Sequence, residues 1–410
     1  MKKYLLIVST CFIAHNFKGQ NYISAAKKDS LWGYIDEKGK TIIDFQYNYA
    51  RNFSCGLAMV KKNGKYYYIN TSNKSITDGS KFVAKTDFSD NRAVVLDPVS
   101  NKKMAINTKG EVIYSNPELE DMQEFYYGYS RIKIADLYGF IDTTGTIKIQ
   151  PKYKYAQRFA GSDDCPLAAV KNGILWIYIR KDGREVIPPP EFEIKDYLYL
   201  IKRGAERKSK ETTLILVRKS LPGDKSESES WFGYMNQEGQ IVIPPVFKKA
   251  NNFHEGLAAV SQNGKQWGYI NTKGEWAIEP KLKSAKNFSG GLAICASEKK
   301  QFIRKDGTVA CTNENFDIKS NFVNGFARVK KGDFIGFIDV NCVLRVPAVH
   351  YKTKEFSCGY LWVLTDKGWA LIDGSGVLVI PPSFTDVRNF VPYSNSVAES
   401  NEPDSGEKDE

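Results

Sequence analysis

Residues 256–280 read GLAAVSQNGKQWGYINTKGEWAIEP, and this stretch spells out two consecutive hairpins. An apolar strand ending at Val260 leads into Asn263-Gly264, a strong hairpin signal because both residues accept a positive φ. A second strand, starting at Trp267, ends in Asn271-x-x-Gly274, where Asn opens a type I turn and Gly takes a left-handed position. The stretch therefore predicts three antiparallel strands joined by tight turns.

The same pattern recurs along nearly the whole chain. Its clearest copies besides Trp267–Asn271 are Trp32–Asp36 and Ile335–Asp339. Weaker copies are Tyr66–Asn70, Met104–Asn107, Tyr138–Asp142, Trp176–Arg180, Phe232–Asn236, Gln301–Arg304 and Trp369–Asp373. They make ten units with a period of roughly 35 residues, broken by one longer interval in the middle. We therefore expect an all-β protein of about ten tandem, three-stranded antiparallel meanders.

Each unit ends in proline and then a short connector. The third strand closes on proline, as in Ile243-Pro244-Pro245, because proline donates no hydrogen bond to a ladder. The connector then reads aromatic, Ala, Phe, as in Phe247, Ala250 and Phe253. The spacing of the last two predicts a single helical or 3₁₀ turn that drops the Phe into the core between units.

Four positions per unit are expected to build the repeat. They are the Trp and Gly of the second strand, the Gly of the second turn and the Phe of the connector. The residues predicted to play these structural roles are Trp32, Gly33, Gly39, Phe53, Gly139, Phe159, Trp176, Gly233, Phe253, Trp267, Gly268, Gly274, Phe288, Gly336, Phe356, Trp369 and Gly376. The aspartates that open the turns are interpreted as turn formers rather than as calcium ligands.

One meander cannot bury its aromatic face alone, so neighbouring units must stack. Ten units exceed the four to eight blades usual for a propeller, and three strands fall short of the usual four. We therefore expect an open, twisted β-superhelix. A propeller-like closed ring and two five-unit lobes are the alternatives.

The repeated Trp-Gly, followed by an aromatic, Ile, Asp/Asn-x-x-Gly and Ile-x-Pro, resembles the bacterial WG-repeat family, also called KWG repeats. The resemblance covers roughly residues 22–390. It implies a β-repeat fold and no particular chemistry. The Gly of the motif is lost at Tyr67, Ile177 and Ala370, so those units are expected to pack less regularly.

Three further segments flank or interrupt the array. Residues 1–20 are predicted to be an export signal, because Lys2 and Lys3 precede a short apolar run; a buried first strand and a lipoprotein signal at Cys11 are the alternatives. The array then spans 21–394, with an insertion at 202–230. Residues 395–410 are predicted to be a disordered acidic tail.

The charge balance suggests anionic partners. The net charge of +11 includes an acidic tail, so the body of the chain is more basic than the whole. The cluster formed by Lys202, Arg203, Arg207, Lys208 and Lys210 in the insertion is the candidate binding site, and a solvated loop is the alternative interpretation.

The sequence contains none of the common catalytic motifs considered below. There is no G-x-S-x-G elbow, no P-loop, no G-x-G-x-x-G after a strand and no C-x-x-C pair. Of three histidines, His15 lies in the signal, and His254 and His350 lack metal-ligand spacing. The six cysteines outside the signal are interpreted as buried free thiols. We predict no catalytic residues, no metal and no cofactor.

These observations predict an exported, non-catalytic scaffold of the cell envelope that binds a protein or an anionic glycan. Nucleic acid is disfavoured because export removes the chain from most of it, and no membrane span is expected. The alternative function is an envelope carbohydrate hydrolase, with carboxylates contributed by several units.

Overall fold

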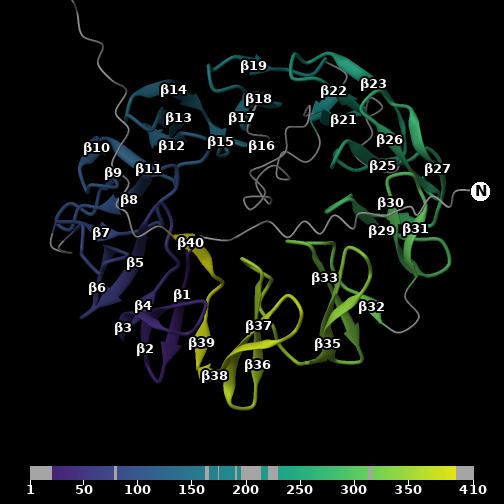
Figure 1. Ribbon diagram of the computed structural model, residues 1–410. Coiled ribbons are helices and arrows are strands. Elements are labelled where there is room, and N and C mark those ends of the chain that lie inside the picture. The colour runs from purple at the N-terminus through teal and green to yellow at the C-terminus, as the bar shows by residue number, and fades with distance from the viewer. Residues whose placement is uncertain are drawn as a thin grey trace, which may run out of the picture.

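The structure is a computed structural model that describes residues 21–77, 81–161, 166–173, 175–189, 192–194, 214–219, 230–312 and 316–393. Its elements are all β-strands, and they form ten small antiparallel sheets. The sheets stand around one axis as the blades of a closed propeller (Figure 1). The open superhelix expected from the sequence is therefore wrong, and the closed ring given as its alternative is correct.

Each blade is built outward from the axis, in chain order. The innermost strands, in blades 1 to 9, are β39 (Asp386–Val387), β4 (Tyr49–Ala50), β7 (Val83–Ala84), β11 (Leu119–Met122), β15 (Tyr155–Ala156), β20 (Phe192–Ile194), β24 (Lys249–Ala250), β28 (Ser284–Ala285) and β32 (Asp317–Ile318). The second strands are β1 (Asn21–Lys28), β5 (Leu57–Lys62), β8 (Arg92–Leu96), β12 (Tyr129–Ile134), β17 (Pro166–Asn172), β21 (Ile215–Lys219), β25 (Leu257–Ser261), β29 (Leu292–Ala296), β33 (Phe326–Lys331) and β36 (Tyr360–Thr365).

The two outer layers carry the motif. The third strands are β2 (Leu31–Asp36), β6 (Lys65–Asn70), β9 (Lys103–Asn107), β13 (Leu137–Asp142), β18 (Leu175–Ile179), β22 (Trp231–Met235), β26 (Trp267–Asn271), β30 (Lys300–Arg304), β34 (Phe334–Asp339) and β37 (Gly368–Asp373). The outermost strands are β3 (Thr41–Tyr47), β10 (Val112–Tyr114), β14 (Ile147–Tyr153), β19 (Glu185–Val186), β23 (Ile241–Phe247), β27 (Trp276–Leu282), β31 (Val309–Thr312), β35 (Leu344–His350) and β38 (Leu378–Phe384). Two short strands, β16 (Ala160–Gly161) and β40 (Val391–Tyr393), pair with β17 and β1.

The innermost strand is the connector for which a helical turn was expected. In blade 2, Tyr49 and Ala50 pair with Lys61 and Val60, and no helix follows before Phe53. The helical turn is therefore wrong, and most blades have a fourth strand. The Phe nevertheless lies where it was expected, because Phe53 is only 5% exposed. A two-residue strand is too short to show the alternation by which strands are recognised in a sequence.

Neighbouring blades are joined by a repeated pair of aromatic rings. The Tyr34 ring of blade 1 lies 4.8 Å from the Phe53 ring of blade 2, and the Tyr34 hydroxyl donates to the Arg51 carbonyl at 2.7 Å. The same ring contact recurs between Tyr68 and Phe88 (4.8 Å), Phe140 and Phe159 (5.0 Å), Tyr234 and Phe253 (4.8 Å), Tyr269 and Phe288 (4.9 Å), Phe302 and Phe322 (4.8 Å), and Phe337 and Phe356 (5.2 Å). Each of the ten interfaces has its own hydrophobic cluster. The core is therefore a ring of small cores between blades.

The ring is closed by the last strands of the chain. Strands β39 and β40 pair with β1, so the carboxyl-terminal connector supplies the inner edge of blade 1. The closing interface also repeats an internal contact: Ser357 Oγ donates to the Phe390 carbonyl at 2.7 Å, as Ser54 does to Phe88 and Ser289 to Phe322. Blades 10 and 1 thus meet in the same way as blades inside the array.

The glycine of the motif makes room for a β-bulge in the outermost strand of the blade. In blade 7, Trp267 pairs with Leu282 and Tyr269 with Ile278, so the single residue Gly268 of β26 lies opposite three residues of β27, 279–281. A Cβ on Gly268 would lie 2.5 Å from the Ile278 carbonyl oxygen. Gly33, Gly139, Gly233 and Gly336 face the same kind of bulge, with a backbone atom at 2.7 Å or less. A side chain at this position would collide with the backbone.

The prolines lie inside these bulged strands rather than at their ends, which corrects the sequence prediction. Pro280 is within β27, and Pro244 and Pro245 are within β23. Because the outermost strand is a sheet edge, the missing N–H at these positions costs no hydrogen bond to a further strand.

The second turn has the geometry that its sequence predicted. Asp36 Oδ1 accepts from the backbone N–H of Lys38 and Lys40 at 2.9 and 2.8 Å, and Gly39 has a φ of 83°. Gly274 and Gly376 occupy the same left-handed position.

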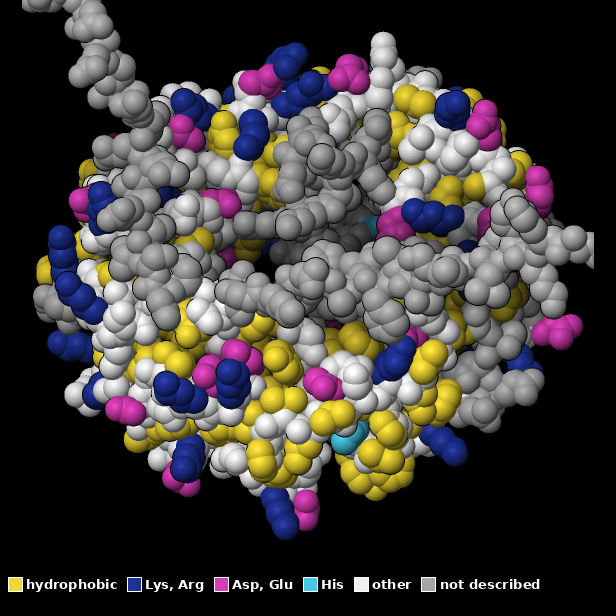
Figure 2. All heavy atoms as spheres, viewed as in Figure 1, with side chains coloured by type: hydrophobic (Ala, Val, Ile, Leu, Met, Phe, Trp, Pro, Cys, Tyr) yellow, Lys and Arg dark blue, Asp and Glu magenta, His cyan; other side chains and the backbone are white. Residues whose placement is uncertain are grey.

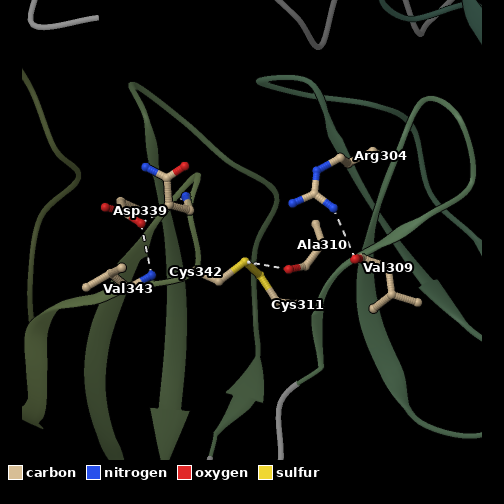
Figure 3. The surroundings of a disulfide bond; sticks show 8 residues. Arg304, Val309, Ala310, Cys311, Asp339, Cys342 and Val343 are labelled. Carbon is tan, nitrogen blue, oxygen red and sulfur yellow. Dashed lines mark hydrogen bonds between the residues drawn. A yellow bond between two sulfur atoms is a disulfide. The ribbon is translucent and has the colours of Figure 1, made fainter. Parts of the chain in front are cut away.

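One interface between blades is covalent. Cys311 on β31 of blade 8 forms a disulfide with Cys342 in the second turn of blade 9, across a Cα–Cα distance of 5.9 Å. Figure 3 shows the Cys342 sulfur beside the Ala310 carbonyl oxygen, 3.4 Å away. The interpretation of all six cysteines as buried free thiols is wrong for this pair and for Cys55, which is free but exposed. Cys295 is free and buried, Cys358 is free and half-buried, and Cys165 lies outside the described residues.

Several predictions concern residues beyond the described ranges. The signal at 1–20, the tail at 395–410 and most of the insertion at 202–230 lie there. Within the insertion, β21 takes the place of the second strand of blade 6.

Candidate binding face

The turns between second and third strands all emerge on one face of the ring, which we name the hairpin face. This follows because the ten blades have the same strand order about one axis. Every one of these hairpins carries at least one lysine. One from each blade in turn is Lys28, Lys61, Lys102, Lys133, Lys171, Lys219, Lys265, Lys299, Lys331 and Lys367.

The turns on the opposite face, between third and outermost strands, have mixed charge. They pair bases such as Lys38, Lys109 and Lys273 with acids such as Glu37, Glu111 and Glu275. On the described hairpins, by contrast, bases clearly outnumber acids. Figure 2 shows charged side chains around the whole circumference of the ring, so the charge is not confined to one blade. A face that carries a lysine on every blade attracts extended anions.

Aromatic rings accompany some lysines on this side of the ring. The Lys61 ammonium lies 5.0 Å from the centre of the Tyr66 ring, and the Lys171 ammonium lies 5.4 Å from that of Tyr155. The Lys248 ammonium, on the connector leading into blade 7, lies 3.9 Å from the Trp231 ring. Ammonium groups at such distances are attracted by the ring quadrupole, which holds the long side chains in place.

A second polar region lies in the loops between the innermost and second strands. Asp87, in blade 3, accepts from Arg51 Nη1 at 3.0 Å, while its other oxygen is buried with no partner among the described residues. Burial raises the pKa of the Asp87 carboxyl, and the Arg51 charge partly offsets this rise. Other carboxyl groups with a resolved shift in the described part have a lowered pKa, so Asp87 stands apart from Asp142 and Glu120.

The predicted structural residues occupy the positions described above. Trp32 and Trp369 are buried, whereas Trp176 and Trp267 are half-buried beside the hairpin face. Phe159, Phe288 and Phe356 are buried like Phe53, and Phe253 is half-buried. The candidate binding residues Lys202, Arg203, Arg207, Lys208 and Lys210 lie outside the described residues. Sequence reasoning missed the hairpin face, although a lysine at each hairpin was a readable signal.

No group of three or more His, Cys, Asp or Glu side chains in the described ranges could hold a metal ion. His254 is buried in blade 7, and burial lowers the pKa of His350. Nothing in the described part of the chain is a helix long and apolar enough to cross a membrane.

Comparison with known proteins identifies the repeat. The family model described as "WG containing repeat" matches residues 32–66, 104–138, 138–176, 232–265, 267–294 and 369–395. The chain is a WG-repeat protein. Its six matched segments fall on blades 1, 3, 4, 6, 7 and 10, so the repeat runs around the whole ring.

Other comparisons add little to this WG-repeat assignment. No curated protein matches the chain. Among solved structures, a eukaryotic initiation factor is 11% identical over 90% of this chain and 98% of that one, with a TM-score of 0.45. AztD from Citrobacter koseri is 10% identical over 92% and 99%, with a TM-score of 0.31. At these TM-scores the similarity carries no information about activity.

Proposed function

We propose that this WG-repeat protein is an exported, non-catalytic scaffold of the cell envelope, and that its hairpin face binds a protein or an anionic glycan. The observation that carries the proposal is the lysine found on every hairpin of a single face. A broad, one-sided basic surface raises the local concentration of polyanions and speeds their association. The ring supplies a rigid platform, because each blade is held by two neighbours.

The disulfide supports the exported location. Cys311 and Cys342 join two blades, and such bonds persist in oxidising compartments. Cell fractionation with an antibody to the chain tests this part of the proposal. We expect the protein in envelope or extracellular fractions, with Cys311 and Cys342 oxidised; a reduced cytosolic pool would contradict it.

Binding is tested with the full chain and envelope extracts at increasing salt. We expect a retained ligand whose affinity falls with ionic strength, because the contacts are between opposite charges on exposed surfaces. Replacing Lys28, Lys102 and Lys331 by Gln should weaken binding, whereas replacing Lys38, Lys109 and Lys273 on the opposite face should not. Equal loss in both triple variants would remove the basis for the hairpin face.

A hydrolase of envelope carbohydrate is the second candidate, and Asp87 is the observation that favours it. A carboxyl with a raised pKa is the kind of group that acts as a general acid. Turnover of an envelope glycan that Asp87→Asn abolishes, with binding retained, would establish this alternative. We expect no such turnover from the native protein.

A further inference from the structure

Blades 2 and 5 share an arrangement of aromatic residues and lysine on the hairpin face. Blade 6 has a related set in register, with phenylalanine rather than tyrosine on the inner strand: Phe192 faces Lys219, which faces Trp231. Across the three inner strands of blade 2, Tyr49 faces Lys61, which faces Tyr66. Across blade 5, Tyr155 faces Lys171, which faces Trp176. Each blade therefore presents an aromatic, a lysine and an aromatic in direct register, and we name these sets the two triplets.

The two rings and the ammonium group of each triplet lie close enough together to contact a single small ligand. The ring centres of Tyr49 and Tyr66 are 6.2 Å apart, and those of Tyr155 and Trp176 are 6.4 Å apart. The Tyr155 side chain is 57% exposed, and the other triplet members are partly exposed. A small ring-shaped ligand can therefore contact both an aromatic face and the ammonium group.

The lysines of the triplets differ from equivalent lysines elsewhere in having no carboxylate across the strand. In blades 1, 4 and 9 the corresponding lysines Lys27, Lys133 and Lys330 face the inner-strand residues Asp386, Asp121 and Asp317. In the two triplets that inner position is a tyrosine. Lys61 and Lys171 have no ion-pair partner among the described residues, so their charge is available to a ligand.

An arginine from the preceding blade fixes the inner strand at both sites. Arg388 Nε donates to the Ala50 carbonyl at 2.8 Å, directly after Tyr49. Arg131 Nη1 donates to the Ala156 carbonyl at 2.6 Å, directly after Tyr155. The two arginines come from different segments, yet both hold the backbone that carries the inner tyrosine. Equivalent support at two separate blades is what two copies of one subsite require.

We propose that the two triplets are subsites for the acidic sugar residues of one uronate-containing polysaccharide. This rests on the proposed function and names the ligand class of that face. The apolar face of a pyranose ring packs on the tyrosine or tryptophan, and its carboxylate pairs with the lysine. The ring planes within the triplets meet at 72° and 40°. They leave no parallel slot between them for a nucleic-acid base.

The test measures binding of the full-length protein to immobilised polygalacturonate. The variant is Lys61→Gln with Lys171→Gln, and its matched control is Lys265→Gln with Lys299→Gln, two exposed lysines of the same face outside the triplets. We expect the triplet variant to lose roughly 10-fold or more in affinity, as expected when charged hydrogen bonds are removed, and the control roughly 3-fold or less. Tyr155→Ser, at an exposed ring, should also weaken binding without lowering the melting temperature.

The possible results distinguish binding at the triplets from general binding to the basic hairpin face. Equal loss in the two lysine variants would overturn the triplets and leave the basic face intact as a scaffold. Undiminished binding to carboxyl-reduced polygalacturonate, or triplet-dependent binding to single-stranded DNA instead, would overturn the assignment to acidic sugars. Failure to bind any polyanion would overturn the proposed function as well.

Discussion

Blades 7 and 8 are neighbours whose two inner strands have equal lengths, yet their outermost strands differ. Blade 7 has Gly268 in its third strand and a seven-residue outer strand that folds back over that glycine. Blade 8 has Gln301 at the equivalent position and a four-residue outer strand tied to blade 9 through Cys311. The glycine of the motif therefore serves the outer strand rather than the strand that contains it.

The same division holds around the ring. Glycine accompanies a seven-residue outer strand in blades 1, 4, 6, 7 and 9. Where the glycine is replaced, at Tyr67, Met104, Ile177 and Gln301, the outer strand is short or absent in the described residues. Blade 10 is the exception, because Ala370 lies beside the full-length β38, and nothing in the structure explains how its methyl group is accommodated. The irregular packing expected of units without glycine is thus confined to their outer edge.

The largest effect should come from the feature that both kinds of blade share. Phe288→Ala and Phe322→Ala remove fully buried rings that pack on blade 7 and blade 8 respectively. We expect each to lower the unfolding free energy by about 3 to 5 kcal/mol, since both leave a cavity. Chemical denaturation measures the change. A much smaller loss for Phe322→Ala would show that blade 8 differs in its core as well as its edge.

The disulfide between blades 8 and 9 should contribute nearly as much to stability. Replacing Cys311 and Cys342 by Ser opens a loop with a sequence separation of 31. We expect a loss of about 3 to 4 kcal/mol through the greater freedom of the unfolded chain. Thermal unfolding with and without reductant is the measurement. Reductant should destabilise the native protein but leave the double variant unchanged, and an unaffected native protein would contradict the prediction.

The effect of Gly268 on stability can be compared with that of Gln301, the residue at the equivalent position of blade 8. Gly268→Ala places a methyl group against the Ile278 carbonyl and the Trp276 ring. We expect a loss of about 1 to 3 kcal/mol from the forced backbone shift. Gln301→Ala, which faces no such bulge, should change stability by less than about 0.5 kcal/mol. Similar values for the two would break the comparison.

The smallest effect is expected in the pH dependence of the unfolding free energy, through a tyrosine at the end of a seven-residue outer strand. Tyr47 ends β3 of blade 1, and burial raises its pKa to about 12. Above the ordinary tyrosine pKa of about 10, the unfolded chain loses this proton while the folded protein keeps it, so stability falls between pH 10 and 12. Tyr47→Phe should flatten that fall in a series of denaturation curves. An unchanged slope would mean that other groups cause it.

Much of the blade could be predicted because its signals are local. Asp36-x-x-Gly39 defines its turn through backbone preferences of single residues, and the structure has this turn. The tight turn predicted at Asn263-Gly264 is instead a five-residue loop between β25 and β26, in which only Gly264 has a positive φ and the Asn263 side chain accepts from the N–H groups of Lys265 and Gln266. The period placed all ten units correctly. The fourth strand was missed because Tyr49-Ala50 is too short to show a pattern, and counting three strands then favoured an open array.

Ring closure and the binding face depend on contacts between distant residues. The connector from Thr385 to Phe390 resembles those that lead into the next blade elsewhere, but its strand β39 pairs with β1, a contact between residues more than 350 positions apart. The triplets are harder to see, because Tyr155, Lys171 and Trp176 become neighbours only through strand register. The basic cluster in the insertion is visible in the sequence because its residues are close along the chain, whereas the triplet residues are close only in space.

The pairing of β39 and β40 with β1 also has a consequence for how the molecule is made. During synthesis from the amino terminus, the first blade waits with an open inner edge until the final strands emerge. Until then the growing chain offers a bare strand to any other chain nearby, so two copies could exchange their last strands and become intertwined. Slow release of the carboxyl terminus should therefore favour interlocked dimers over single rings.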